Sequence, residues 1–158
     1  MIQISSIKIC KENFKPYGDI IDYDKEKSFS INQRTTVRFD SLATINVQYG
    51  HPIISLFKAS PRKLPLEVQF LEKHPYGTQA FFPLNNCPWL VVVSNSTNPN
   101  SVICFSLKGN QGIQYNIDTW HYPLITLHKK QDFIVIDREN SNENINVVKL
   151  KEKILINN

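Results

Sequence analysis

Short apolar or alternating segments recur along the whole chain, separated by Pro, Gly, Asn and Asp. They are rich in Val, Ile, Phe and Tyr, which pack well on the pleated surface of a sheet, and their spacing is typical of many short antiparallel strands. The predicted strands span residues 3–9, 18–23, 34–40, 53–58, 66–73, 78–83, 88–94, 101–106, 112–117, 122–128 and 132–137, with a last one near 145–150. The pattern therefore predicts an all-β domain of the jelly-roll or small-barrel type.

Helical character is confined to one short segment, CKENFKPYG at residues 10–18, which Pro16 and Gly18 would end quickly. The sequence His-Pro-Tyr-Gly at 74–77 has Pro in its second position and Gly in its last, and this favours a reversal between two strands. No internal repeat or Gly/Ser linker divides the 158 residues, so we expect one domain over 1–158. The tail from residue 140 onward is either an added strand or a loose end.

Composition and charge exclude several classes of protein. The net charge of +4 comes from scattered basic residues without interleaved aromatics, which does not predict nucleic-acid binding but suits the attraction of a small anion. The longest wholly apolar run, residues 89–93, is far too short to cross a membrane. The amino terminus lacks the apolar stretch of a signal peptide, so we expect a cytoplasmic protein.

The cysteines do not indicate a structural framework. Cys10, Cys87 and Cys104 are odd in number, widely spaced and free of any CxxC pair. Neither a disulfide scaffold nor a zinc ribbon is therefore expected. The chain also lacks a GxSxG elbow, an HExxH motif and a Gly-rich phosphate loop.

A polar group interrupts the apolar segment FLEKHPYGTQAFFPL, residues 70–84. Side chains alternate along a strand, so Glu72 and His74 lie on the same face. If the two strands that flank the turn pair with each other, Gln79 comes near both. The three side chains would then line the mouth of a pocket, although a solvated hairpin end explains the segment equally well.

A distant histidine extends this pattern. His121 follows Trp120 in YNIDTWHYPLITL, and a lone His among aromatics is more often a packed core residue than a ligand. However, Glu-x-His, a turn, Gln and a later His resemble the cupin barrels, which place His-x-His and a carboxylate around one hairpin and a further His on a later strand. On that resemblance Glu72 and His74 take the two first positions, and Gln79 and His121 take the carboxylate and last positions. Imidazole with oxygen donors suits a divalent transition metal such as nickel or manganese without selecting one.

Two arginines lie in strand-like stretches. Arg38 precedes Asp40 closely, and such an Arg is usually solvent-facing or half of an ion pair. The functional alternative is a guanidinium fork that binds a substrate carboxylate through two parallel hydrogen bonds. Asp137 and Arg138 are interpreted as a structural ion pair at the edge of a sheet.

Six blocks of the chain together resemble the ureidoglycolate lyase family, formerly called ureidoglycolate hydrolase. In chain order they are FKPYGDIID, FSINQRTTVRFDSLA, LEKHPYGTQAFFPL, WLVVVS, GIQYNIDTWHYPLI and DFIVIDRE, and they cover roughly residues 2–140. Two positions depart from the family pattern. Gln33 stands where many members have Gly, and Lys73 replaces the usual Arg before the His.

The resemblance implies a single cupin-like jelly-roll β-barrel with few short helical segments, commonly a homodimer. It also implies the cleavage of (S)-ureidoglycolate into glyoxylate and urea during allantoin degradation, with nickel as a stimulating rather than strictly required metal. The residues expected to be catalytic are Glu72, His74 and His121. The expected substrate contacts are Arg38, Gln79 and Trp120. If a metal binds, its expected ligands are Glu72, His74, Gln79 and His121.

These roles compete, because a histidine bound to a metal cannot also be a free base. Two other functions fit the same sequence: an amidohydrolase that releases ammonia from ureidoglycolate, and a non-catalytic cupin that binds a small carboxylic acid. A structural protein with a filled barrel is a further alternative, and it predicts that Glu72, His74 and His121 all face solvent.

Overall fold

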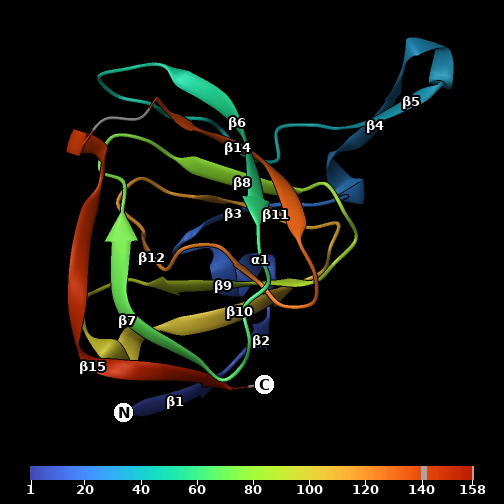
Figure 1. Cartoon of the computed structure of the whole chain (residues 1–158). Helices are drawn as coiled ribbons and strands as arrows, with labels where there is room; N and C mark the ends of the chain where they lie inside the picture. The colour runs from blue at the N-terminus through green and yellow to red at the C-terminus, as the bar shows by residue number, and fades with distance from the viewer. Residues whose placement is uncertain (140–141, 158) are drawn as a thin grey trace.

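The computed structural model describes residues 1–139 and 142–157 and confirms an all-β, nearly closed barrel (Figure 1). The eight-stranded sheet, sheet A, contains in spatial order β1 (Ile2–Ser5), β15 (Asn146–Asn157), β7 (Leu66–Lys73), β12 (Trp120–His121), β9 (Trp89–Ser94), β10 (Ile103–Leu107) and β2 (Ile7–Lys8), with β13 (Ile125–Thr126) paired to β9. The five-stranded sheet B contains β3 (Gly18–Ile21), β11 (Gly112–Tyr115), β8 (Gln79–Pro83), β14 (Gln131–Arg138) and β6 (Pro52–Ala59).

The remaining elements are short. A separate hairpin is formed by β4 (Ser28–Ile31) and β5 (Thr36–Phe39). The helix α1 (Lys11–Phe14) is the predicted helical turn. Four single 3-10 turns complete the described elements: η1 (Lys25–Lys27), η2 (Asn32–Arg34), η3 (Pro99–Ser101) and η4 (Asn142–Asn144). Within the described residues, no helix is long and apolar enough to cross a membrane.

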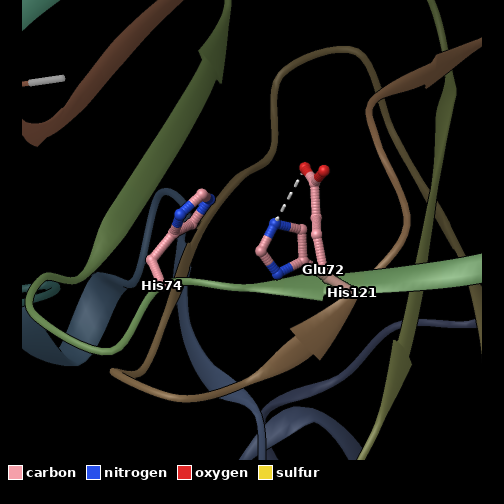
Figure 2. A group of neighbouring side chains, drawn as sticks. All are labelled: Glu72, His74 and His121. Carbon is pink, nitrogen blue, oxygen red and sulfur yellow. Dashed lines mark ion pairs between the residues drawn. The ribbon is translucent and has the colours of Figure 1, made fainter. Parts of the chain in front are cut away.

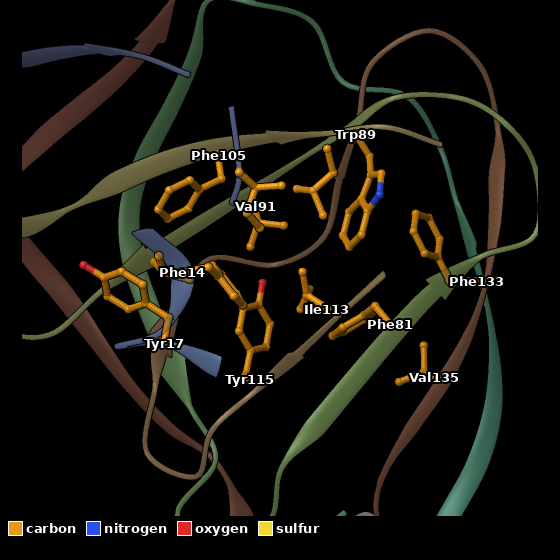
Figure 3. Close-up of a cluster of buried hydrophobic side chains, with 13 residues drawn as sticks. Phe14, Tyr17, Phe81, Trp89, Val91, Phe105, Ile113, Tyr115, Phe133 and Val135 are labelled. Atoms are coloured by element: carbon orange, nitrogen blue, oxygen red, sulfur yellow. The ribbon is translucent and has the colours of Figure 1, made fainter. Parts of the chain in front are cut away.

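Two hydrophobic cores lie on the two faces of β9. Trp89, Val91 and Val93 face sheet B and join the aromatic core drawn in Figure 3. Leu90 and Val92 face the other way, into a core shared with β7, β10 and β15. A strand buried on both faces reads as a continuous apolar run, which explains the sequence WLVVVS. Each fully buried side chain of this kind contributes about 1.5–3 kcal/mol to the folded state.

The structure corrects one prediction that mattered for the site. Pairing of the strands that flank the turn at residues 74–77 is the condition under which Gln79 would lie beside Glu72 and His74, but β7 belongs to sheet A and β8 to sheet B. These strands therefore do not pair, and the turn carries the chain from one sheet to the other. Gly77 in this crossing forms an isolated bridge with Val47.

Other differences concern strand bounds. The strand β4 was not predicted because its sequence SFSI is short and half polar. The predicted strand at 122–128 contains only the two-residue β13, and His121 lies on a separate short strand, β12, that ends before this range. The described part of the tail forms β15, which is longer than expected and pairs with β7 and β1. The added-strand alternative is therefore correct for residues 146–157, whereas residues 140, 141 and 158 lie outside the described part of the chain.

Candidate metal and substrate site

Three side chains predicted from the sequence converge at one end of the space between the sheets. Glu72 lies on β7, His74 follows it at the start of the crossing turn, and His121 on β12 is the register partner of Glu72. One ligand atom from each residue lies within 4.8 Å of the other two. His121 Nε2 is 3.6 Å from Glu72 Oε1, and the two imidazole centroids are 5.2 Å apart (Figure 2).

The backbone fixes how both imidazoles present their nitrogens. His74 Nδ1 is 2.7 Å from the Asn144 carbonyl oxygen, and His121 Nδ1 is 2.9 Å from that of Thr119. A carbonyl oxygen only accepts, so each Nδ1 carries the hydrogen and donates it. In a neutral ring Nε2 then keeps a lone pair, and both Nε2 atoms are buried without a hydrogen-bond partner in the described structure. Metal-binding histidines are commonly held in this way.

The surroundings of His74 favour a neutral imidazole. The pKa of His74 lies below its usual value, chiefly because burial disfavours the charged ring and also because His121 is close. The ring of Tyr115 stacks on His121 with centroids 4.3 Å apart and an interplanar angle of 18°. Two imidazoles and one carboxylate form a donor set that suits a divalent transition metal.

The three residues open onto a cleft bordered by β6. One chamber of about 380 Å³ is lined by Glu72, Gln79 and His121 together with apolar side chains such as Phe57 and Leu124. An adjoining chamber of about 310 Å³ shares Glu72 and Gln79 and adds His74 and Asp137. Clefts of this size hold small ligands, and this one combines apolar walls with a few convergent polar groups.

Gln79 reaches this cleft from sheet B, although the predicted strand pairing is absent. Its Nε2 donates to Asp137 Oδ2 over 3.2 Å. The other oxygen, Asp137 Oδ1, is buried and has no hydrogen-bond partner among the described residues. Sequence reasoning missed Asp137 as a site residue, because only the packing of β14 beside β8 brings it to the cleft. Its neighbour Arg138 donates to the backbone carbonyls of Gln48 and Tyr49.

Two predicted substrate contacts lie away from the three convergent residues. Arg38 is exposed on the hairpin, where its guanidinium pairs with Asp40 at 2.6 Å and lies over the ring of Phe29. Trp120 precedes His121 on β12 and so faces the opposite way, with Lys73 Nζ 5.0 Å from its ring centroid. Within one protomer the structure therefore joins Glu72, His74, His121 and Gln79 but not these two side chains.

Comparison with known proteins gives a consistent result. The family model described as ureidoglycolate lyase matches residues 1–157. A ureidoglycolate lyase of Burkholderia mallei (strain NCTC 10229) is 40% identical over 158 residues, covering 98% of this chain and 93% of the relative. One from Pseudomonas fluorescens (strain Pf0-1) is 42% identical over 141 residues, covering 86% and 84%. The match extends over almost the whole chain, and the barrel that it covers brings Glu72, His74 and His121 together in one cleft. The chain therefore belongs to the ureidoglycolate lyase family.

Proposed function

We propose that this protein is an enzyme that cleaves (S)-ureidoglycolate into glyoxylate and urea, a step in the degradation of allantoin and hence of purines. Membership of the family supports the substrate and the lyase class. The single structural observation that carries the proposal is the pair of buried Nε2 atoms of His74 and His121, which have no hydrogen-bond partner among the described residues and lie close to the Glu72 carboxylate. A filled structural barrel would not leave two such nitrogens facing a cleft.

The reaction requires little machinery. Ureidoglycolate carries a hydroxyl, a carboxylate and a ureido nitrogen on one carbon. A base removes the hydroxyl proton, the oxygen forms the aldehyde carbonyl of glyoxylate, and the bond from carbon to nitrogen breaks. The departing nitrogen takes up a proton to give urea. Neither water nor a covalent nucleophile is consumed, so general acid–base groups and charge stabilisation suffice.

The described residues divide these tasks. His74 Nε2, His121 Nε2 and a Glu72 oxygen would hold a divalent metal, for which their neutral and anionic donors are suited. When bound, such an ion supplies Lewis acidity toward the substrate oxygens. His74 and His121 would then act as ligands, and their Nδ1 hydrogen bonds to backbone carbonyls keep the rings in place.

A different group must then move the proton, and Asp137 is suited to this role. Its Oδ1 is buried in the cleft and has no hydrogen-bond partner in the described part of the chain, so it can accept the hydroxyl proton and return it to the departing nitrogen. Gln79 is anchored by donating to the other oxygen of the same carboxylate. The amide oxygen of Gln79 then remains to accept an N–H of the ureido group. We therefore assign Gln79 to the substrate rather than to the metal.

Product analysis tests the proposal. Purified protein is incubated with ureidoglycolate, and urea, ammonia and glyoxylate are quantified before and after treatment with a chelator. We expect equal amounts of urea and glyoxylate, and a lower rate after chelation that returns when a divalent transition metal is added. Release of ammonia would instead show an amidohydrolase. Thermal stabilisation by glyoxylate without any turnover would show a carboxylic-acid-binding protein.

A further inference from the structure

The hairpin of β4 and β5 projects away from the barrel (Figure 1). Its two strands pair with each other and form a separate sheet. No residue from 28 to 39 is buried in the single protomer. An isolated two-stranded hairpin is only marginally stable in water, so this one needs support from outside its own strands.

Both faces of the hairpin carry exposed apolar side chains. Phe29 lies opposite Arg38 in the register, and Val37 lies opposite Ser30, so Phe29 and Val37 point to different faces. Their exposed fractions are 49% and 55%. A hairpin with one face in solvent would be polar on that face. The hairpin is therefore suited to insertion between other surfaces.

A second unpartnered surface lies on β6. Among the described strands, this strand of eight residues pairs only with β14 and forms the edge of sheet B. Its outward side chains Ile54 and Leu56 are 76% and 70% exposed. They lie opposite Ile136 and Ile134 of β14, which extend the apolar surface across the sheet. A long apolar edge strand is a template for pairing with another chain, and monomeric proteins normally protect such edges.

Charge links the two surfaces. The described walls of the cleft contain the carboxylates of Glu72 and Asp137 together with two cationic residues, Lys58 and Arg138, and Arg138 donates to backbone carbonyls. The inward side chains Ile53, Ser55 and Phe57 of β6 form one rim. The hairpin carries Arg34 and Arg38, and the ion pair of Arg38 with Asp40 is exposed and therefore easily exchanged. A hairpin placed along β6 would bring a guanidinium to a cleft that, on the proposed function, must hold a substrate carboxylate.

We propose that a second copy of this chain covers both surfaces, and that the hairpin of each protomer lies along β6 of the other. Arg38 then binds the substrate carboxylate in the partner's cleft, so that each active site is built from two chains. In a two-fold dimer, the hairpin and the β6 edge of each protomer are both covered by the other protomer, as in isologous interfaces. The interface does not depend on the proposed function, whereas the role of Arg38 rests on it.

Solution mass tests the interface without any assay of turnover. Light scattering after size-exclusion chromatography should give a dimer for the wild type. Val37→Asp on the hairpin and Leu56→Asp on β6 should each shift the protein to monomer, because either places a charge in the apolar contact. Ile7→Asp is the matched control: Ile7 is 48% exposed on a strand of sheet A, and this variant should stay dimeric. A monomeric wild type, or dimeric Val37→Asp and Leu56→Asp variants, would overturn the interface.

Complementation tests the shared site. Arg38→Ala and His121→Ala chains, each with its own affinity tag, are co-expressed, and mixed dimers are isolated by both tags in turn. If Arg38 acts in the partner's cleft, each mixed dimer contains one intact site and recovers about half the wild-type turnover, while both homodimers stay nearly inactive. If Arg38 acts in its own protomer, no intact site forms, and the absence of recovery overturns the proposal.

A conservative variant separates binding from support of the fold. Arg38→Lys should remain dimeric and keep kcat while KM rises several-fold, because a point charge replaces the two-pronged contact. An unchanged KM would remove Arg38 from the carboxylate site. If the wild type does not turn over ureidoglycolate, titration with glyoxylate measures the number of intact sites per dimer instead. Mixed dimers should bind one equivalent of glyoxylate, whereas wild-type dimers should bind two. A failure of the proposed function is thereby distinguished from a failure of the shared site.

Discussion

The space between the two sheets is filled at one end and open at the other. At the filled end, Trp89 packs edge-on against Phe133 at 5.0 Å, and both are almost fully buried. At the open end, the Nε2 atoms of His74 and His121 are buried beside a cleft and have no hydrogen-bond partner among the described residues. An unsatisfied buried nitrogen costs stability, whereas aromatic packing provides it. The contrast shows that one end of the interior holds the sheets together so that the other can keep polar atoms in an unfavourable but reactive arrangement.

The largest expected effect is at the open end. His121→Ala should lower kcat/KM for ureidoglycolate by about 10²–10³-fold, the loss that follows when one group supporting charge stabilisation in the transition state is removed. It should also lower the amount of bound metal, because one of three proposed ligands is lost. Steady-state kinetics and elemental analysis measure the two effects. Wild-type turnover with a wild-type metal content would remove His121 from the site.

The reverse outcome is expected at the filled end. Phe133→Ala should reduce the free energy of unfolding by about 3–5 kcal/mol, because it leaves a cavity in the aromatic core. The protein that remains folded should keep its KM, since Phe133 does not line the chambers that contain Glu72. Urea titration gives the stability, with Ile7→Ala as an exposed control. If Phe133→Ala destabilises no more than that control, the filled end does not hold the sheets together.

Asp137→Asn removes a charge from the open end without changing the shape of the side chain. We expect kcat to fall about ten- to hundredfold, because the proposed proton acceptor is lost; interactions with charged groups are worth about 1.5–3 kcal/mol. Stability should be unchanged or higher, because a partly unsatisfied buried charge is removed. Kinetics paired with thermal unfolding check both effects. A large loss of stability with unchanged kcat would make Asp137 structural.

The smallest effect is expected where the two ends meet. Tyr115 belongs to the aromatic core and also stacks on His121. Tyr115→Leu keeps an apolar side chain but loses the stacking, which contributes about 0.5–1.5 kcal/mol. We expect modest losses in both unfolding free energy and metal affinity, measured by denaturant titration and calorimetry. An effect on the unfolding free energy alone would assign Tyr115 to the filled end. An effect on metal affinity alone would assign it to the open end.

Local pattern alone determined much of this protein. The alternation of side chains predicts that Glu72 and His74 share a face, and they do. The turn residues predict a reversal after His74, and the apolar run WLVVVS predicts a buried strand. The resemblance to cupin barrels, rather than the local pattern, pointed to His121, and its ring centroid lies 5.2 Å from that of His74. These features could be predicted because each depends on residues that are close in the chain or on a recognisable spacing.

Only the tertiary structure decided which strands are neighbours. The turn after His74 predicts a hairpin, yet β7 and β8 join different sheets, and Gln79 reaches the cleft across the space between them. Asp137 enters the cleft because β14 lies beside β8, a contact between segments more than 50 residues apart. Arg38 lies outside its own cleft because the hairpin leaves the barrel. Pairing between distant strands depends on how the faces of whole sheets pack against each other. The sequence of a single strand therefore does not specify which strand it pairs with.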